Sequence, residues 1–290
     1  MLLIIVFYLK VRWILSPIFA AMYFIDSHTH LFSNQFNDDR HAMVERAIAE
    51  KVEHMIMPNV DLESIEGMYA LEAKFPENCY ATMGLHPCSV KADFEEVLLK
   101  MEAELEQRTF AAIGETGLDY YWDLTFKAEQ KQSLIAHIKW AKRYKIPIIL
   151  HTRESLEDAL TLIEAHNDDD LRGVFHCFGG TKDDIDRIGA LGGFYVGIGG
   201  VLTFKKSNLP ELLVDTPWEM IVLETDSPYL APTPYRGKRN ESAYIPFIAK
   251  KMAEIKKCSI EDVAKITSKN AEKLFYSAFM LKHGAKVIKS

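Results

Sequence analysis

The chain has 290 residues, of which 48% are hydrophobic and 26% are charged, and its formal net charge is −7. This composition is typical of a globular protein and excludes the disordered and fibrous classes. The acidic balance argues against a protein that coats nucleic acid through its net charge, but it leaves room for an enzyme with a local basic patch. Length alone would permit two domains, although α/β barrels of about 200–250 residues form a single domain.

Residues 1–21 are mostly apolar but are interrupted by Lys10 and Arg12. A membrane-spanning helix needs about 20 apolar residues with few charges, and a secretory signal carries its positive charges before the apolar run. We therefore interpret residues 1–21 as an upstream extension outside the fold, or a mis-assigned start, rather than a membrane anchor. We expect no membrane contact.

The four cysteines form no C-x-x-C pair, and their spacing does not suggest a disulfide framework. We interpret them as reduced thiols, which favours the cytoplasm as the compartment. They are Cys79, Cys88, Cys177 and Cys258.

Short apolar runs rich in β-branched residues recur along the chain, with amphipathic stretches between them. Alternation of strand and helix predicts parallel strands joined by crossovers, and eight such units close into a (β/α)8 TIM barrel. We expect one hydrolase domain over residues 22–280, followed by a tail at 281–290. The predicted strands are Tyr23–Asp26, His54–Pro58, Cys79–Leu85, Phe110–Gly114, Pro147–Leu150, Gly173–Phe175, Phe194–Ile198 and Met220–Leu223.

Helices are predicted where apolar residues recur at helical spacing. Asp38–Lys51 is one such stretch, with Asp38 or Asp39 as its N-cap, and Phe126–Tyr144 is another. Near the C-terminus, Ser259 has the features of an N-cap, with acidic residues following it in the first turn.

Polar residues stand where the predicted strands stop. In a TIM barrel the chemistry lies at the carboxyl ends of the strands, so these side chains should converge on one rim. The candidates are His28, His30, His86, Glu115, His151, Arg153, His176 and Asp226.

Six of these residues are suitable metal ligands. His28 and His30 are two residues apart, so on extended backbone they point to the same side and can share one divalent ion. Six ligands exceed the needs of one small cation. We therefore predict two ions, of Mg²⁺, Mn²⁺ or Zn²⁺, one held by His28, His30 and Asp226 and the other by His151 and His176, with Glu115 between them.

Two such ions can clamp the attacking and leaving oxygens of a displacement at phosphorus. In this scheme Glu115 and Asp226 are the catalytic carboxylates, and Asp226 also takes a proton as general base. Arg153 is predicted to bind phosphate, with a structural salt bridge as the alternative. His86 is predicted to contact the phosphate or the leaving group, unless it only supports its neighbours. Cys177 follows His176, and strand alternation predicts that its side chain turns away as a buried spectator.

Two further groups could contact a polyanionic substrate. Lys205-Lys206 and the basic residues Arg236, Lys238 and Arg239 fall in the loops after the last two strands, where they form a basic rim or are simply solvated. Tyr120, Tyr121 and Trp122 could stack on bases, although packing of the loop on a helix explains them equally well.

The motifs "DSHTHL", "GLHP", "IGETGLDY", "LHTRE", "FHCFGG", "ETDSPYL" and "RGKRNE" together resemble the TatD family of metal-dependent deoxyribonucleases, from about Met22 to Phe275. The resemblance implies a TIM barrel with a two-metal site and divalent-ion-dependent cleavage of DNA, in some members as a 3′–5′ exonuclease. It places the six predicted ligands at the family's metal positions. One departure is Cys88, which stands where many members have a second histidine.

Other functions stay open at this point. An amidohydrolase acting on a cyclic amide or ester shares the barrel and the paired histidines, but many binuclear members use a carboxylated lysine where this chain has Glu115. Hydrolysis of an aminoacyl-tRNA ester is a related alternative. The intact ligand set argues against a scaffold without catalysis. DNA is the expected partner as substrate, and no stable protein partner is inferred.

Overall fold

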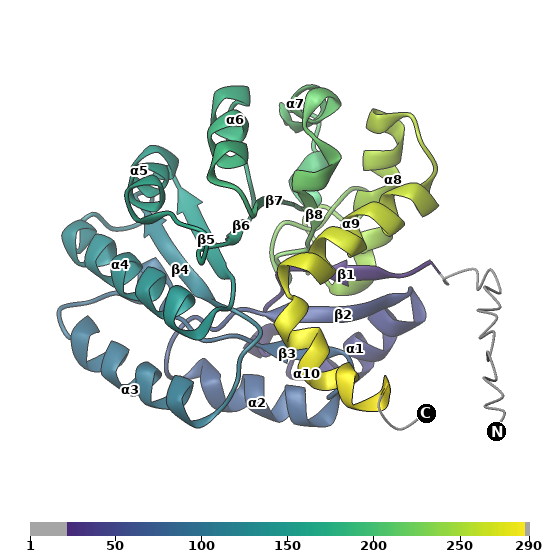
Figure 1. Ribbon diagram of the computed structural model, residues 1–290. Coiled ribbons are helices and arrows are strands. Elements are labelled where there is room, and N and C mark those ends of the chain that lie inside the picture. Colours follow the sequence, from purple (N-terminus) through teal and green to yellow (C-terminus); the bar gives the residue numbers. More distant parts are fainter. Residues whose placement is uncertain (1–21, 288–290) are drawn as a thin grey trace, which may run out of the picture.

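The protein is described by a computed structural model that covers residues 22–287, so the predicted extension at residues 1–21 lies outside the described residues. Eight strands alternate with helices, and Figure 1 shows the helices arranged around the strands. The strands are β1 (Phe24–Asp26), β2 (Val52–Met57), β3 (Cys79–Ala81), β4 (Ile113–Asp119), β5 (Ile148–Arg153), β6 (Gly173–Phe175), β7 (Phe194–Ile198) and β8 (Ile221–Leu223).

Ten α-helices connect and follow these strands in the described part of the chain. They are α1 (Arg40–Ala49), α2 (Ser64–Lys74), α3 (Phe94–Gln107), α4 (Lys127–Tyr144), α5 (Leu156–His166), α6 (Lys182–Leu191), α7 (Leu209–Asp215), α8 (Ile245–Lys256), α9 (Ile260–Leu274) and α10 (Tyr276–Val287). The two helices predicted from spacing correspond to α1, which is two residues shorter at each end, and to α4, which begins one residue later and ends at Tyr144 as predicted.

All strand pairs are parallel, and the barrel closes at two seams. The ladders run β1-β2-β3 and β4-β5-β6-β7-β8. Backbone hydrogen bonds connect the two sheets. The N–H of Ala111, two residues before β4, donates to the carbonyl of Ala81 in β3 at 2.9 Å, and the N–H of Ser27, directly after β1, donates to the carbonyl of Leu223 in β8 at 3.0 Å. The predicted (β/α)8 TIM barrel is thereby confirmed.

Six of the eight strands have bounds that differ from the prediction, and the differences are largest for β3, β4 and β5. β4 and β5 continue past their apolar runs, since Gly117 pairs with His151 and Asp119 pairs with Arg153, whereas β3 ends at Ala81. A strand is held by backbone hydrogen bonds, so polar residues continue it wherever their side chains line a cavity. Glu115 and His151 therefore lie within strands and not after them.

The end of the barrel away from the strands' carboxyl ends is filled by the C-terminal helices. Ala271 and Leu274 of α9 and Ala278 of α10 pack on a second core cluster that includes Ile25 and Val222, and Figure 1 shows these helices in front of the strands. Ser259 caps α9 as predicted, because its hydroxyl accepts the Asp262 N–H at 3.1 Å in a capping box.

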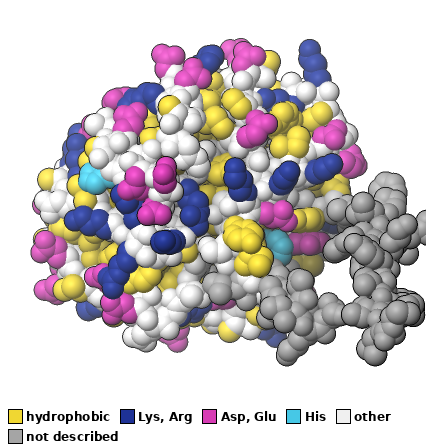
Figure 2. All heavy atoms as spheres, in the orientation of Figure 1, with side chains coloured by type: hydrophobic (Ala, Val, Ile, Leu, Met, Phe, Trp, Pro, Cys, Tyr) yellow, Lys and Arg dark blue, Asp and Glu magenta, His cyan; other side chains and the backbone are white. Residues whose placement is uncertain are grey.

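Asp39 occupies the N-cap position of α1 but makes no capping hydrogen bond there. Its carboxylate binds Arg239 and Arg46 instead. Figure 2 shows basic and acidic side chains intermingled over the face on view. No helix in the described residues is long and apolar enough to cross a bilayer.

Candidate metal centre

Glu115 lies at the middle of the predicted cluster, and each of its carboxylate oxygens faces a different set of histidines. Oε2 lies 3.3 Å from Nε2 of His28 and 3.4 Å from Nε2 of His30. Oε1 lies 2.9 Å from Nε2 of His176 and 3.0 Å from Nδ1 of His151. Glu115 is 1% exposed, so water hardly competes for these contacts. The carboxylate thus lies between the two sets of histidines.

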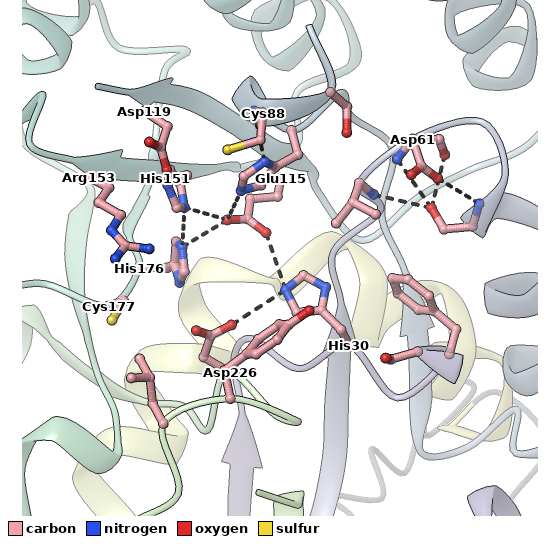
Figure 3. A pocket seen from close by; sticks show the side chains of 18 of the residues that line it. His30, Asp61, Cys88, Glu115, Asp119, His151, Arg153, His176, Cys177 and Asp226 are labelled. Atoms are coloured by element: carbon pink, nitrogen blue, oxygen red, sulfur yellow. Dashed lines mark hydrogen bonds and ion pairs between the residues drawn. The ribbon is translucent and has the colours of Figure 1, made fainter. Parts of the chain in front are cut away.

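Asp226 completes the group on the His30 side. Its Oδ1 lies 3.5 Å from Nε2 of His30 and 3.8 Å from Nε2 of His28. The Asp226 N–H donates to the carbonyl of His28 at 2.9 Å, so the seam between β1 and β8 sets this arrangement. Figure 3 shows His30 and Asp226 on one side of Glu115, with His151 and His176 on the other. The convergence predicted for the six residues is therefore found.

Hydrogen bonds to groups outside the cluster determine which ring nitrogen of two histidines carries the proton, and hence which nitrogen presents a lone pair to the centre. His30 Nδ1 lies 3.2 Å from the carbonyl of Pro58, which can only accept, so Nδ1 carries the proton. His151 Nε2 donates to Asp119 at 2.9 Å. A neutral imidazole has one N–H, so Nε2 of His30 and Nδ1 of His151 present lone pairs to the centre, as a metal ligand must.

Two carboxylates that sequence reasoning missed support these histidines. Asp119 binds His151, and Glu224 lies with Oε1 3.6 Å from Nδ1 of His176 while it accepts the Cys177 N–H at 2.5 Å. For Asp119 the available signal was its even spacing from Glu115, four residues earlier on β4, whereas Glu224 and Asp226 follow β8, where strand alternation does not apply. Side chains at even separations on a strand share a face.

The electrostatics of the cluster favour positive charge beside Glu115. Burial alone would raise the pKa of the Glu115 carboxyl, but the charges of His176, His86 and His28 outweigh burial and hold it well below its usual range. Burial would lower the pKa of His176, yet the Glu115 carboxylate raises it well above its usual value. A cation is therefore stabilised at this place.

The residues fit a divalent metal. Buried Glu115 Oε2 and His28 Nδ1 have no hydrogen-bond partner among the described residues. The Nε2 atoms of His28 and His30 are 3.2 Å apart, as are His151 Nδ1 and His176 Nε2. Paired nitrogens at that distance need a shared proton or cation between them. Ligand atoms within 4.8 Å of one another occur in the sets His28, Glu115, His176; His28, His30, Asp226; and His86, Glu115, His151.

His86 differs from the other histidines in its tautomer. Its Nδ1 accepts the Cys88 N–H at 3.1 Å, so the neutral ring carries its proton on Nε2. That nitrogen faces Glu115 Oε1 at 3.4 Å. His86 thus presents a donor to the centre, which suits an oxygen of a substrate better than a metal ion.

The cluster forms the floor of a cavity of about 1060 Å³. Arg153 lies on its wall beside His151 and His176 (Figure 3). Within the described residues the Arg153 side chain makes no ion pair; it lies over the Tyr121 ring at 3.8 Å. The alternative of a structural salt bridge for Arg153 is not what the structure shows.

Two expectations about nearby residues are wrong. Cys177 is half-buried and lines the cavity, because β6 ends at Phe175 and the φ of 47° at Cys177 breaks the strand alternation. Arg239 does not stand free on a basic rim, since it binds Asp39 at 2.7 Å and lies over the Phe36 ring at 4.6 Å. Lys205 and Lys206 are exposed.

The closed barrel and the histidines and carboxylates that converge at its cavity place the protein in the class of metal-dependent hydrolases. The family described as TatD related DNase matches residues 25–276, and the chain belongs to this TatD family.

Sequences of known relatives align with this chain over almost their whole lengths. The metal-dependent hydrolase YabD of Bacillus subtilis is 36% identical over 86% of this chain and 98% of its own. The 3′–5′ ssDNA/RNA exonuclease TatD of Escherichia fergusonii is 32% identical over 88% of this chain and 99% of its own. Among solved structures, the TatD homologue YjjV of Escherichia coli K12 superimposes with a TM-score of 0.82 at 28% identity, over 87% of this chain and 98% of its own. The chain is thus a metal-dependent hydrolase of the TatD family.

Proposed function

We propose that the protein cleaves phosphodiester bonds of DNA, as a 3′–5′ exonuclease. The observation that carries the proposal is the position of Glu115, whose two oxygens face two separate sets of histidines. A pair of ions shared by one carboxylate suits displacement at phosphorus. The relative from Escherichia fergusonii, named as a 3′–5′ ssDNA/RNA exonuclease, supports the same substrate class.

Two divalent ions, of Mg²⁺, Mn²⁺ or Zn²⁺, are proposed as cofactors. Bound there, such ions supply Lewis acidity that makes water a nucleophile near neutral pH and that offsets developing charge. One set of ligands is His28, His30 and Asp226, the other is His151 and His176, and Glu115 belongs to both.

Other residues of the cavity are proposed to transfer a proton and to bind the substrate. Asp226 is proposed as the general base, because its side chain is 15% exposed whereas that of Glu115, which also lines the cavity, is 2% exposed. Arg153 can bind a phosphate oxygen pair, since no carboxylate among the described residues occupies its guanidinium. His86 can donate its Nε2 proton in a hydrogen bond to a substrate oxygen.

The test is a nuclease assay on end-labelled single-stranded and duplex DNA, RNA and a panel of cyclic amides and esters, with each of the three metals. We expect shortening from the 3′ end that needs metal. Glu115→Gln should lower kcat/KM by about 10²–10³-fold, in the range seen when electrostatic groups of an active site are removed. It should also lower the number of ions bound.

Glu95→Gln is the matched control, because Glu95 is exposed on α3. Activity on a cyclic amide or ester with DNA left intact would overturn the proposal, as would full nuclease activity in Glu115→Gln. The four cysteines are free thiols, which supports the cytoplasm as the proposed compartment.

A further inference from the structure

Two aromatic side chains stand exposed beside the cavity, directly after β4. Trp122 is 68% exposed and Tyr121 is 50% exposed. Tyr120, the third aromatic residue of this run, differs from them: it is partly buried, and its hydroxyl binds Asp158 at 2.8 Å. Packing therefore accounts for Tyr120 but not for Trp122, which lines the cavity. The adjacent rings of Tyr121 and Trp122 form an exposed apolar patch at the mouth of the cavity, and such patches mark sites of ligand contact.

The aromatic pair is fixed relative to the cluster by a single carboxylate. Oδ1 of Asp119 accepts the backbone N–H of Tyr121 at 2.9 Å and that of Trp122 at 3.2 Å. Oδ2 of the same group accepts the Nε2 proton of His151 at 2.9 Å. The backbone that carries Trp122 is thus tied through Asp119 to a predicted metal ligand, so the attachment point of the ring is fixed relative to the cluster.

Tyr121 and Trp122 have different roles in this arrangement. The guanidinium of Arg153 covers the Tyr121 ring at 3.8 Å, whereas it lies 5.2 Å from the Trp122 ring. The two rings meet edge to face, with centroids 4.9 Å apart. Tyr121 therefore orients a cation toward the cavity, and Trp122 keeps open ring surface.

We infer that Trp122 is a stacking platform for an unpaired nucleobase of the substrate, while Arg153, supported by Tyr121, binds a neighbouring phosphate. The inference rests on the proposed nuclease function and adds the element that the substrate recognises: a flat base next to the cleaved phosphodiester. Stacking on an aromatic side chain is independent of sequence because every base offers a π-face.

An unpaired base fits the rest of the cavity better than a base pair does. Exposed Tyr229 and Leu230 of the loop after β8 line the same cavity as Trp122. A base that enters this space can contact these apolar side chains, whereas in a duplex the face of the base is already covered by stacking. Single-stranded ends should therefore be preferred over blunt duplex ends.

The test compares two single-stranded oligonucleotides that differ only at the terminal position, where one has a normal nucleotide and the other an abasic residue. The comparison is made once with this position at the 3′ end and once, in separate substrates, with it at the 5′ end. For the wild-type protein we expect KM to be ~10-fold lower for the normal terminal nucleotide, since stacking on an aromatic side chain is worth about 1–3 kcal/mol per base. Trp122→Ala should abolish the difference, and Trp122→Phe should largely keep it.

Leu124→Ala is the control, because Leu124 is 60% exposed in the same loop but does not line the cavity. Binding can also be measured without cleavage, by adding the oligonucleotide to the metal-free protein and following its Trp fluorescence. A base that stacks on Trp122 should quench this fluorescence, and Trp122→Phe should lose the quenching. An unchanged ratio of KM values in Trp122→Ala would overturn the inference, even with the nuclease intact. Absence of cleavage of any nucleic acid by the wild-type protein would instead overturn the proposed function.

Discussion

Asp119 and His151 form a hydrogen-bonded pair in which Nε2 of the imidazole lies 2.9 Å from the carboxylate, so that Nδ1 is left to face Glu115 at 3.0 Å. Burial raises the pKa of Asp119, but the hydrogen bond from His151, together with the backbone N–H groups of Tyr121 and Trp122, outweighs burial and lowers the pKa to about 2. The acceptor is therefore ionised at neutral pH, and the tautomer of His151 is set by a residue that does not face the cluster itself.

Replacement of Asp119 should weaken metal binding without removing a ligand. An amide at this position can donate to Nε2 and so favour the tautomer that places a proton on Nδ1 of His151. We expect Asp119→Asn to lower metal affinity by about 10–100-fold, as loss of an orienting partner does elsewhere. Competition with a fluorescent chelator measures the affinity. Asp123→Asn is the control, since Asp123 is exposed, and equal affinities in the two variants would contradict the prediction.

Gly117 should be essential for the ladder that carries the predicted ligands. It has a φ of +135°, and an added Cβ would lie 2.1 Å from the carbonyl oxygen of His151. We expect Gly117→Ala to lower the free energy of unfolding by roughly 2–6 kcal/mol, because overpacking and backbone strain each cost roughly 1–3 kcal/mol. Urea unfolding measures this value. Gly179→Ala, with open space around its Cβ, should change it little, and similar values for both would refute the argument.

His137 should make the stability depend on pH. Its Nε2 accepts the Leu85 N–H at 2.9 Å and its Nδ1 lies 2.7 Å from the Ser133 carbonyl. Burial lowers its pKa from 6.5 to about 4. The unfolded state therefore binds the proton more tightly, so this contribution to stability is complete above about pH 7 and falls as pH decreases toward 4.

The shift corresponds to a loss on the order of 3 kcal/mol across that window. Urea unfolding from pH 7.5 to pH 4 should show it in the wild-type protein, and His137→Gln should flatten the dependence. His41→Gln, at an exposed position on α1, should leave the wild-type slope in place. An unaltered slope in His137→Gln would show that other groups control acid stability.

Lys206 and Arg239 should respond differently to substitution, although both follow late strands of the barrel. Lys206 is exposed and Arg239 is bound to Asp39. For single-stranded DNA each phosphate contact adds about 0.7 to the slope of log K against log salt concentration. We expect Lys206→Ala to reduce the slope by about that amount and Arg239→Ala to leave it unchanged while lowering the melting temperature. The reverse pattern would place Arg239 in the DNA contact.

The sequence alone was sufficient for the fold class and for the cluster of candidate ligands. The eight apolar runs predict parallel strands, and polar residues such as His28, His176 and Asp226 follow the runs directly. In a closed parallel barrel the carboxyl ends of all strands meet at one rim, so topology brings together residues that are almost two hundred positions apart. This rule needs no knowledge of side-chain packing. The ligands predicted from the strand pattern are therefore the same as those implied by the family resemblance.

Only the tertiary structure decided which side chain supports which. Asp119 and Glu224 lie next to His151 and His176 because β4 continues past its apolar run and because neighbouring strands fix the register. Cys177 faces the cavity because one backbone torsion departs from strand geometry. Arg239 binds Asp39 across two hundred positions of sequence. Partners of polar groups depend on distances of a few ångströms set by the packing of distant elements, and periodicity along one chain carries no information about such distances.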